Sequence, residues 1–183
     1  MQLGKVGPMI RLEEHRPEWA EAFRVEAERI RRAAGDALTA VEHIGSTAVP
    51  GLRAKPIIDL AAAAAPGVDP FGLDATLGPL GYAQHRTGPR NHGVHVRMAG
   101  GARIRILHVF AAEAWATCPQ RLFRDRLLRD PDARRRYDAL KADVAATAAD
   151  GRAYTAAKQG LVQELVDAER ADRGLPPVRV GDK

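Results

Sequence analysis

The stretch HIGSTAVPGLRAKPIIDL, residues 43–60, decides the fold of this protein. It consists of a short apolar segment, a Gly-Ser turn, a proline-bounded loop and a second apolar segment that contains one acid. The β-branched pair Ile57-Ile58 in a continuous apolar run predicts a strand covered on both faces, placed at 55–61. Pro50-Gly51 marks the loop. We therefore predict two strands joined by a loop that begins at Gly45-Ser46.

The turn carries the residue types of a phosphate-binding site. A Gly-Ser turn frees backbone N–H groups and offers a hydroxyl, which together can hold phosphate oxygens. Gly45 and Ser46 are therefore candidate ligand contacts, with an ordinary tight turn as the alternative. Thr47 is a further candidate, although we favour a role for it in capping a short helix after the turn.

Asp59 is the acid in the second apolar segment, where an unpaired carboxylate would be costly. A metal ion, a cation or backbone donors must meet it. It could simply pin the preceding loop, but we favour a role in a site, because perturbed acids beside phosphate-type turns tend to be site residues. Lys55, four residues earlier, would lie some distance along the same strand face.

Helix and strand patterns extend from this stretch in both directions. Upstream, Pro17–Ala34 predicts a helix that Gly35 ends. Downstream, we expect a helix at 70–80, strands at 94–98 and 103–110, and helices at 115–128 (interrupted near Cys118-Pro119), 131–148 and 154–171. The tail at 174–183 is expected to fray.

Length and composition exclude several protein classes. A chain of 183 residues favours a single domain, and a net charge of +5 with a pI of about 9.8 favours anionic partners. Only 5% of the residues are aromatic, which argues against a nucleic-acid partner. The single Cys118 excludes a disulfide framework. No apolar run approaches a membrane span of about 18 residues, and Met1–Arg11 lacks a signal sequence, so we expect a cytoplasmic protein without membrane contact.

The stretch 43–60 resembles, almost residue by residue, the signature of the GrpB-like family, which belongs by fold to the nucleotidyltransferase superfamily. The resemblance covers about residues 10–168. The matching positions outside the stretch are Pro17, Trp19, Phe23, Gly35-Asp36, Leu80-Gly81-Tyr82, Leu107-His108-Val109, Phe123-Arg124-Asp125, Tyr137, Leu140-Lys141, Tyr154 and Lys158.

This resemblance implies an α+β fold, a minimal nucleotidyltransferase-like mixed β-sheet with packed helices and a helical C-terminal third. We place the nucleotidyltransferase-like core at 10–112, the C-terminal helices at 113–171 and the tail at 172–183. In some bacteria a GrpB-like domain is fused to dephospho-coenzyme A kinase, which suggests a role in coenzyme A metabolism.

The resemblance also implies a reaction, the transfer of a nucleotidyl group from ATP or another nucleoside triphosphate to a small acceptor. Gly45 and Ser46 match the pair that holds the triphosphate, and Asp59 matches one acid that binds Mg²⁺. Positive charge from Lys55 and from Arg103 or Arg105 would neutralise the ligand, and Arg124 lies in a family motif. The acceptor, the nucleotide preference and the oligomeric state are not predicted.

The departures from active nucleotidyltransferases are as informative as the matches. Ile57 and Ala61, which alternate with Asp59 on its strand face, supply no second carboxylate, and His108 stands where a third acid is expected. Arg105-Ile106 stand where the family often has two histidines. Either one metal suffices, with substrate oxygens completing its shell, or the protein is a non-catalytic module that binds a nucleotide or a phosphorylated metabolite.

The remaining candidates have structural as well as functional interpretations. Ile106, His108 and Phe110 share a strand face, so His108 is either a core histidine or a base or ligand in the site. A zinc site of His92, His95 and His108, as in a histidine-metal hydrolase, is disfavoured because His92 and His95 fall on opposite strand faces.

Two helical features of the C-terminal third are also open. Seven arginines at 121–136 are typical of a solvated helix face, but could form a phosphate-attracting wall. For Tyr154 and Lys158 we favour packing of the tyrosine and solvent exposure of the lysine.

Overall fold

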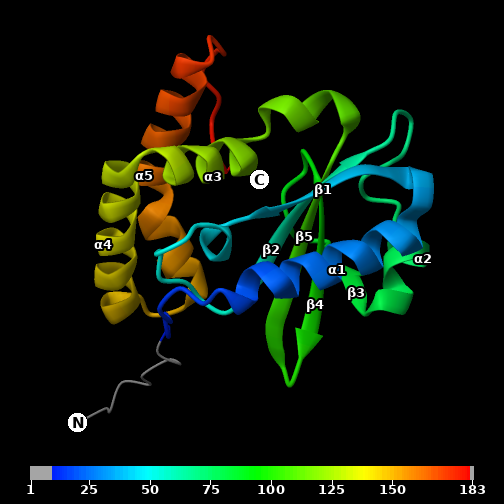
Figure 1. Cartoon of the computed structure of the whole chain (residues 1–183), viewed down its shortest axis with the longest axis horizontal. Helices are drawn as coiled ribbons and strands as arrows, with labels where there is room; N and C mark the ends of the chain where they lie inside the picture. Colours follow the sequence, from blue (N-terminus) through cyan, green and yellow to red (C-terminus); the bar gives the residue numbers. More distant parts are fainter. Residues whose placement is uncertain (1–9, 182–183) are drawn as a thin grey trace.

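Five strands form one mixed sheet in the computed structural model, which describes residues 10–181 (Figure 1). The strand order is β1-β2-β5-β4-β3, with β2 and β5 parallel and the other neighbours antiparallel. The strands are β1 (Leu38–Ile44), β2 (Ile58–Ala64), β3 (Tyr82–Gln84), β4 (Gly93–Ala99) and β5 (Ala102–Phe110). This arrangement confirms the α+β class expected from the sequence.

Helix α1 (Glu18–Ala34) covers one face of the sheet (Figure 1). Its apolar stripe, which includes Trp19, Ala27 and Ile30, packs against Leu60 of β2 and Leu107 of β5. Because β2 lies between β1 and β5, all of its residues except Asp59 are buried. The predicted strand with both faces covered is confirmed, although it begins at Ile58 and so leaves Lys55 in the loop.

Three helices stack beside the sheet on the left of Figure 1: α3 (Pro119–Arg129), α4 (Pro131–Thr147) and α5 (Gly151–Asp172). The carboxylates of Asp130 and Asp150 cap α4 and α5 by accepting hydrogen bonds from the backbone N–H groups of their first turns. Val49 and Leu52, from the loop between β1 and β2, are buried in the apolar core of these helices. The loop therefore joins the sheet to the helices.

Two local expectations differ from the structure, and a third is confirmed. The helix predicted at 70–80 is only α2 (Asp74–Leu77) with the 3₁₀ turn Gly78–Leu80 after it. Strand β3 was not predicted, because it has three residues in an irregular stretch. The interruption at Cys118-Pro119 is confirmed, since a 3₁₀ segment at Ala112–Thr117 precedes α3.

The C-terminal tail, predicted to fray, is attached to α5 in the part that the structure describes. The Gln163 side chain donates to the Val178 carbonyl (2.7 Å) and accepts from the Val180 N–H (2.7 Å), and Gln159 donates to the Val180 carbonyl (3.0 Å). The N-terminal segment in which no signal sequence is expected lies mostly outside the described residues. Within 10–181, no helix is long and apolar enough to cross a membrane.

Candidate functional site

The turn at Gly45 requires a glycine for two reasons. Its φ of +71° lies in the left-handed region, which side chains other than glycine rarely adopt. In addition, a Cβ at this position would lie 2.5 Å from Oδ2 of Asp59. The Asp59 carboxylate is therefore pressed against the Gly45 backbone, which brings the two sequence-predicted residues together.

Thr47 closes the turn instead of capping a helix. It lies within the 3₁₀ turn Ser46–Ala48, which has no side-chain cap, and its hydroxyl donates to the Ile57 carbonyl (3.2 Å). Nε2 of His43 lies 3.0 Å from the same hydroxyl. The capping role was wrong, because the Thr47 side chain is used to hold the two ends of the loop together.

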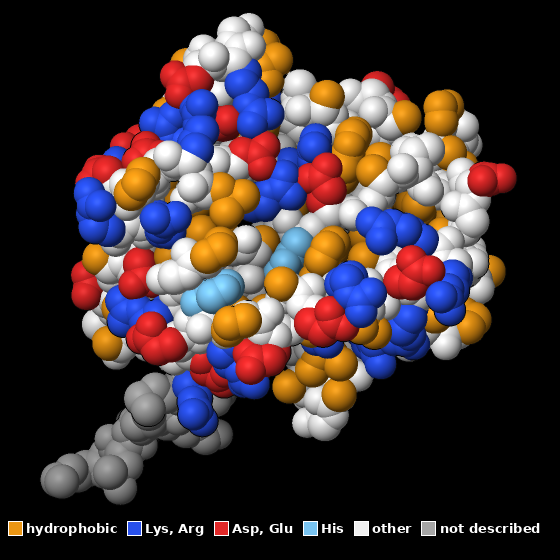
Figure 2. Space-filling model, viewed as in Figure 1, with side chains coloured by type: hydrophobic (Ala, Val, Ile, Leu, Met, Phe, Trp, Pro, Cys, Tyr) orange, Lys and Arg blue, Asp and Glu red, His pale blue; other side chains and the backbone are white. Residues whose placement is uncertain are grey.

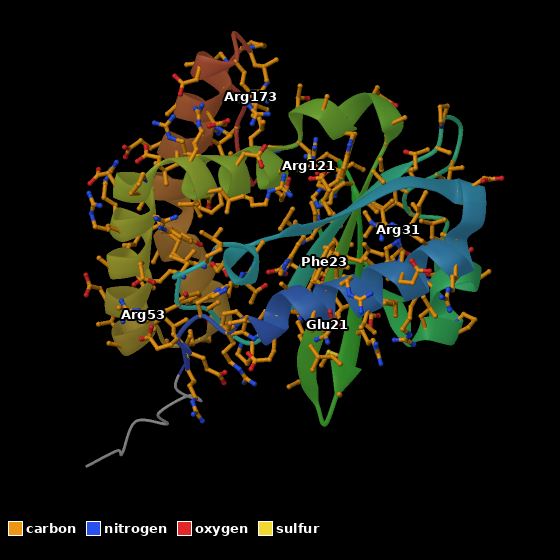
Figure 3. All side chains as sticks on the ribbon, in the orientation of Figure 1. Glu21, Phe23, Arg31, Arg53, Arg121 and Arg173 are labelled. Carbon is orange, nitrogen blue, oxygen red and sulfur yellow. The ribbon has the colours of Figure 1, made fainter. Side chains whose placement is uncertain are left out.

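The far end of the loop is fixed to α4. The Arg53 backbone and guanidinium both donate to the Asp138 carboxylate, at 2.7–3.1 Å. The buried Lys141 ammonium donates to the Arg53 carbonyl. In Figure 3, Arg53 lies beside α4, at the junction of the sheet with the helices. The loop is thus rigidly placed before any ligand binds.

A cleft of about 1130 Å³ lies between this loop, the sheet, α5 and the docked tail. Of the sequence-predicted site residues it is lined by Ser46, Thr47, Lys55, Asp59 and Arg103. The further polar side chains that line it are His85, Thr87, Lys141, Arg152, Tyr154, Thr155, Lys158 and Gln159. The cleft is large enough for a nucleotide-sized ligand.

Asp59 is the single carboxylate among the described residues that line the cleft. Burial raises the pKa of its carboxyl to about 7, and the positive charge of Lys158 acts in the opposite direction. In the loop, the N–H groups of Ala48, Val49 and Leu52 bind loop carbonyls instead of this carboxylate. Asp59 is therefore available to the cleft and does not pin the loop by hydrogen bonds from these groups.

Lysines from α4, α5 and the loop line the cleft together with Asp59 and Tyr154. The ammonium groups of Lys55 and Lys158 lie 4.3 and 4.0 Å from the centroid of the buried Tyr154 ring. Burial lowers the pKa of Lys158 to about 8 and that of Lys141 to about 7, and it also lowers the pKa of Lys55. Packing of Tyr154 is confirmed, but solvent exposure of Lys158 was wrong, because the lysine lies partly buried in the cleft.

Three other candidates are not brought into this cleft. Arg105 pairs with Ile58 in the sheet register, so it lies on the face opposite to Asp59. Arg124 donates to Glu42, to Asp125 and to the His43 carbonyl, and so joins α3 to β1.

His108 is the third candidate outside the cleft. It shares the face of Asp59, but it lies two residues further along β5, where its Nδ1 is 2.9 Å from Nε2 of His92 and its ring stacks near Phe110. Burial lowers the pKa of both imidazoles, to about 3 for His108 and about 4 for His92. His95 lies on the other face and contacts the Pro70 carbonyl, so the three histidines do not meet.

The cleft does not fit a resident pair of Mg²⁺ ions. Mg²⁺ requires several oxygen ligands, and Asp59 stands alone beside the apolar Ile57 and Ile106 and the cationic Lys158. Across residues 10–181, no three His, Cys, Asp or Glu side chains come together as a metal site. The side chains that line the cleft therefore do not fit a metal ion held by the protein alone.

The comparisons with known proteins agree with this architecture. A family model described as GrpB protein matches residues 9–168. The chain belongs to the GrpB family. UPF0157 protein PA4798 of Pseudomonas aeruginosa is 36% identical over 168 residues, which cover 90% of this chain and 69% of that protein. UPF0157 protein BH1888 of Halalkalibacterium halodurans is 33% identical over 163 residues, 88% of this chain and 83% of that protein.

Solved structures show the same fold. The crystal structure of conserved protein GrpB from Enterococcus faecalis superposes with a TM-score of 0.77 at 24% identity, over 90% of this chain and 99% of that one. A chain of the GLD-2/RNP-8 complex superposes with a TM-score of 0.51 at 12% identity, over 92% of this chain and 64% of that one. The likeness to these two structures shows the fold of this chain.

Ser46 and Asp59, both candidates from the sequence, line one cleft, but sequence reasoning missed the lysines from the helices. Lys141 and Lys158 are among the few lysines in a chain whose cations are mostly arginine. Lys141 follows an apolar position on α4, and Lys158 lies one helical turn after Tyr154. The rarity of lysine and its spacing from tyrosine were the signals that could have found them.

Proposed function

We propose that this GrpB-family protein binds a phosphorylated small molecule, in the first place a nucleotide, in the cleft lined by Ser46, Lys55, Asp59 and Lys158. One observation carries the proposal: the cations that line the cleft outnumber the carboxylates, and burial lowers the pKa values of the three lysines among them, Lys55, Lys141 and Lys158. The Lys141 ammonium lies 3.8 Å from the Asp138 carboxylate, whereas Lys55 and Lys158 form no ion pair within the described residues. A desolvated ammonium group of this second kind gains most from a bound anion, because the anion replaces the favourable interactions with water that burial removed.

The distribution of charge elsewhere supports the cleft as the anion site. On the side of the molecule that carries α1, basic and acidic side chains are interspersed (Figure 2). An extended basic stripe, as expected of a nucleic-acid-binding surface, is not seen on that side. A small ligand held in the cleft therefore fits better than a polynucleotide.

Nucleotidyl transfer is the second candidate function, favoured by the contact between Gly45 and Asp59 and by the nucleotidyltransferase superfamily that the resemblance to GrpB-like proteins implies. An acceptor hydroxyl would attack the α-phosphorus of a nucleoside triphosphate. The new oxygen–phosphorus bond forms as the bond to pyrophosphate breaks. Asp59, with a pKa near 7, is suited to take the hydroxyl proton. Lys55 and Lys158 would neutralise the leaving pyrophosphate.

Calorimetric titration with the four ribonucleoside triphosphates, their diphosphates, coenzyme A and dephospho-coenzyme A tests the proposal. We expect at least one of these ligands to bind, and Lys158→Met to weaken it, whereas Arg32→Met, an exposed residue of α1, leaves the affinity unchanged. Absence of binding across the panel contradicts the proposal. Pyrophosphate release with small alcohols, acids or amines, lost in Asp59→Asn, would establish transfer; binding without release would establish the non-catalytic module.

A further inference from the structure

The cleft supplies its own positive charge. Among the described residues, Lys55, Arg103, Lys141, Arg152 and Lys158 line it, against the one carboxylate of Asp59. Two of these cations are held in place by an aromatic ring, since the Lys55 and Lys158 ammonium groups lie 4.3 and 4.0 Å from the centroid of Tyr154. The positive charge is thus preorganised before a ligand arrives.

A divalent cation finds a poor environment beside Asp59. The carboxylate is pressed against the Gly45 backbone on one side and experiences the field of the Lys158 ammonium. The same lysine that stabilises an anion repels a second cation. One carboxylate cannot by itself replace the hydration shell that Mg²⁺ gives up reluctantly.

We propose, on the basis of the function proposed above, that this cleft takes the phosphates of its ligand directly on lysine ammonium groups, without a divalent cation. Lys55 and Lys158 bind phosphate oxygens in the place where a metal-dependent site would position Mg²⁺. Tyr154 fixes the two lysines so that little side-chain entropy is lost on binding.

In a metal-free site, the Asp59 carboxylate changes the affinity for a nucleotide in the direction opposite to its effect in a metal site. A carboxylate that holds Mg²⁺ increases the affinity for a nucleotide, and its removal abolishes binding. A carboxylate beside metal-free phosphates repels them, so its neutralisation strengthens binding. Asp59→Asn therefore separates the two arrangements by the direction of its effect.

The first experiment is calorimetric titration of the full chain with ATP, once with EDTA and once with excess MgCl₂. We expect the affinity for ATP in EDTA to be equal to that in Mg²⁺ or up to about 10-fold higher. Metal-free ATP carries more negative charge and is attracted more strongly by the lysines. Binding that requires Mg²⁺, or that Mg²⁺ tightens about 10-fold or more, overturns the metal-free proposal but leaves the proposed function intact. Absence of ATP binding in both conditions overturns the metal-free proposal, and the ligand panel above then decides the proposed function separately.

The second experiment compares Asp59→Asn with Asp143→Asn, which removes the same charge from an exposed position on α4. In EDTA, we expect Asp59→Asn to bind ATP about 3-fold more tightly and Asp143→Asn to bind it as the unaltered protein does. Weaker binding by Asp59→Asn, in a variant whose circular dichroism is native, overturns the proposal. Electron paramagnetic resonance of Mn²⁺ gives a readout without nucleotide: no bound Mn²⁺ is expected, and a stoichiometric site that Asp59→Asn removes overturns the proposal.

Discussion

Arginines of α3 and lysines of the cleft carry the same charge in opposite circumstances. Arg121 and Arg124 form charge-assisted hydrogen bonds with Glu42 of β1 at 2.8–2.9 Å, and Arg124 also binds Asp125. In Figure 3, Arg121 extends from α3 toward β1. Lys55 and Lys158 instead face an aromatic ring and each other's charge, with Asp59 as the single acid among the described lining residues.

This difference separates cations that hold the fold together from cations that await a ligand. A guanidinium satisfies a carboxylate with several donors at once and stays charged when buried. Burial destabilises the charged form of an ammonium group and so lowers its pKa, as it does for Lys158. The arginines of 121–136 are thus neither a uniformly solvated face nor the wall of the cleft.

The largest expected effect is the loss of stability in Arg124→Met. The substitution leaves Glu42 and Asp125 with one partner fewer at a partly buried contact between α3 and β1, and we expect a cost of about 3 kcal/mol in the free energy of unfolding. Urea denaturation measures it. The ATP affinity of the folded protein should be unchanged. A loss of stability no larger than that of the exposed Arg32→Met, within about 0.5 kcal/mol, contradicts a structural role.

The next effect concerns binding instead of stability. The double variant Lys55→Met/Lys158→Met should bind ATP about 30-fold more weakly, which corresponds to about 2 kcal/mol. Its free energy of unfolding should not fall, because methionine retains the apolar stem and removes a desolvated charge. Calorimetry and urea denaturation measure the two quantities. If the variant keeps its affinity for ATP but has a lower free energy of unfolding, these lysines have a structural role like that of Arg121 and Arg124.

Asp59→Asn should increase stability at neutral and alkaline pH. Because the folded pKa is raised to about 7 from 3.8, the unfolded chain ionises first, and the fold loses stability as the pH rises from 3.8 to 7. We expect the variant to be more stable than the unaltered protein by about 2 kcal/mol at about pH 8, and equally stable near pH 4. Urea denaturation at both pH values is the test; lower stability at alkaline pH would show that the ionised carboxylate has a partner in the fold.

The smallest effect is a pH dependence of affinity. Lys158 is faced by Lys55, Asp59 and Tyr154, and its pKa of about 8 means that it loses its proton above that pH in the free protein. Since phosphate binds the charged form, we expect ATP affinity to fall about 5-fold between about pH 7 and pH 9. Lys158→Arg retains its charge throughout this range and should bind with less pH dependence. If the affinity of the unaltered protein and that of Lys158→Arg fall equally steeply with pH, the pH dependence belongs to a group other than Lys158.

Much of the fold could be predicted because it depends on local patterns. The helix at α1 follows from apolar spacing between Pro17 and Gly35, and the central strand follows from Ile57-Ile58 with the alanines after them. The segments that were predicted wrongly are short or are fixed by residues distant in the sequence. The 70–80 helix is reduced to one turn before a 3₁₀ turn at a proline, and the tail is held against α5 by side chains that include those of Gln159, Gln163 and Arg170.

The site divides in the same way. Gly45-Ser46 and Asp59 lie in one short stretch of the sequence and could be predicted together. They are in contact because Gly45 follows β1 and Asp59 lies in the neighbouring strand β2. Lys141 and Lys158 lie about eighty to one hundred residues further on, and their spacing in the chain gives no measure of their distance from Asp59. His108, although near in the sheet, points to a histidine partner outside the cleft.

The amino-acid sequence by itself determined the family, the α+β sheet with its helices, and the Gly45-Ser46 turn followed by an acid in the next strand. These follow from periodicity, from backbone conformational preference and from a signature within eighteen contiguous positions, 43–60. Only the tertiary structure decided which cations have carboxylate partners and which do not. That distinction depends on packing between α3, α4, α5 and the sheet, because burial and the charges brought close by the fold, not residue type, set the free energy of each charge.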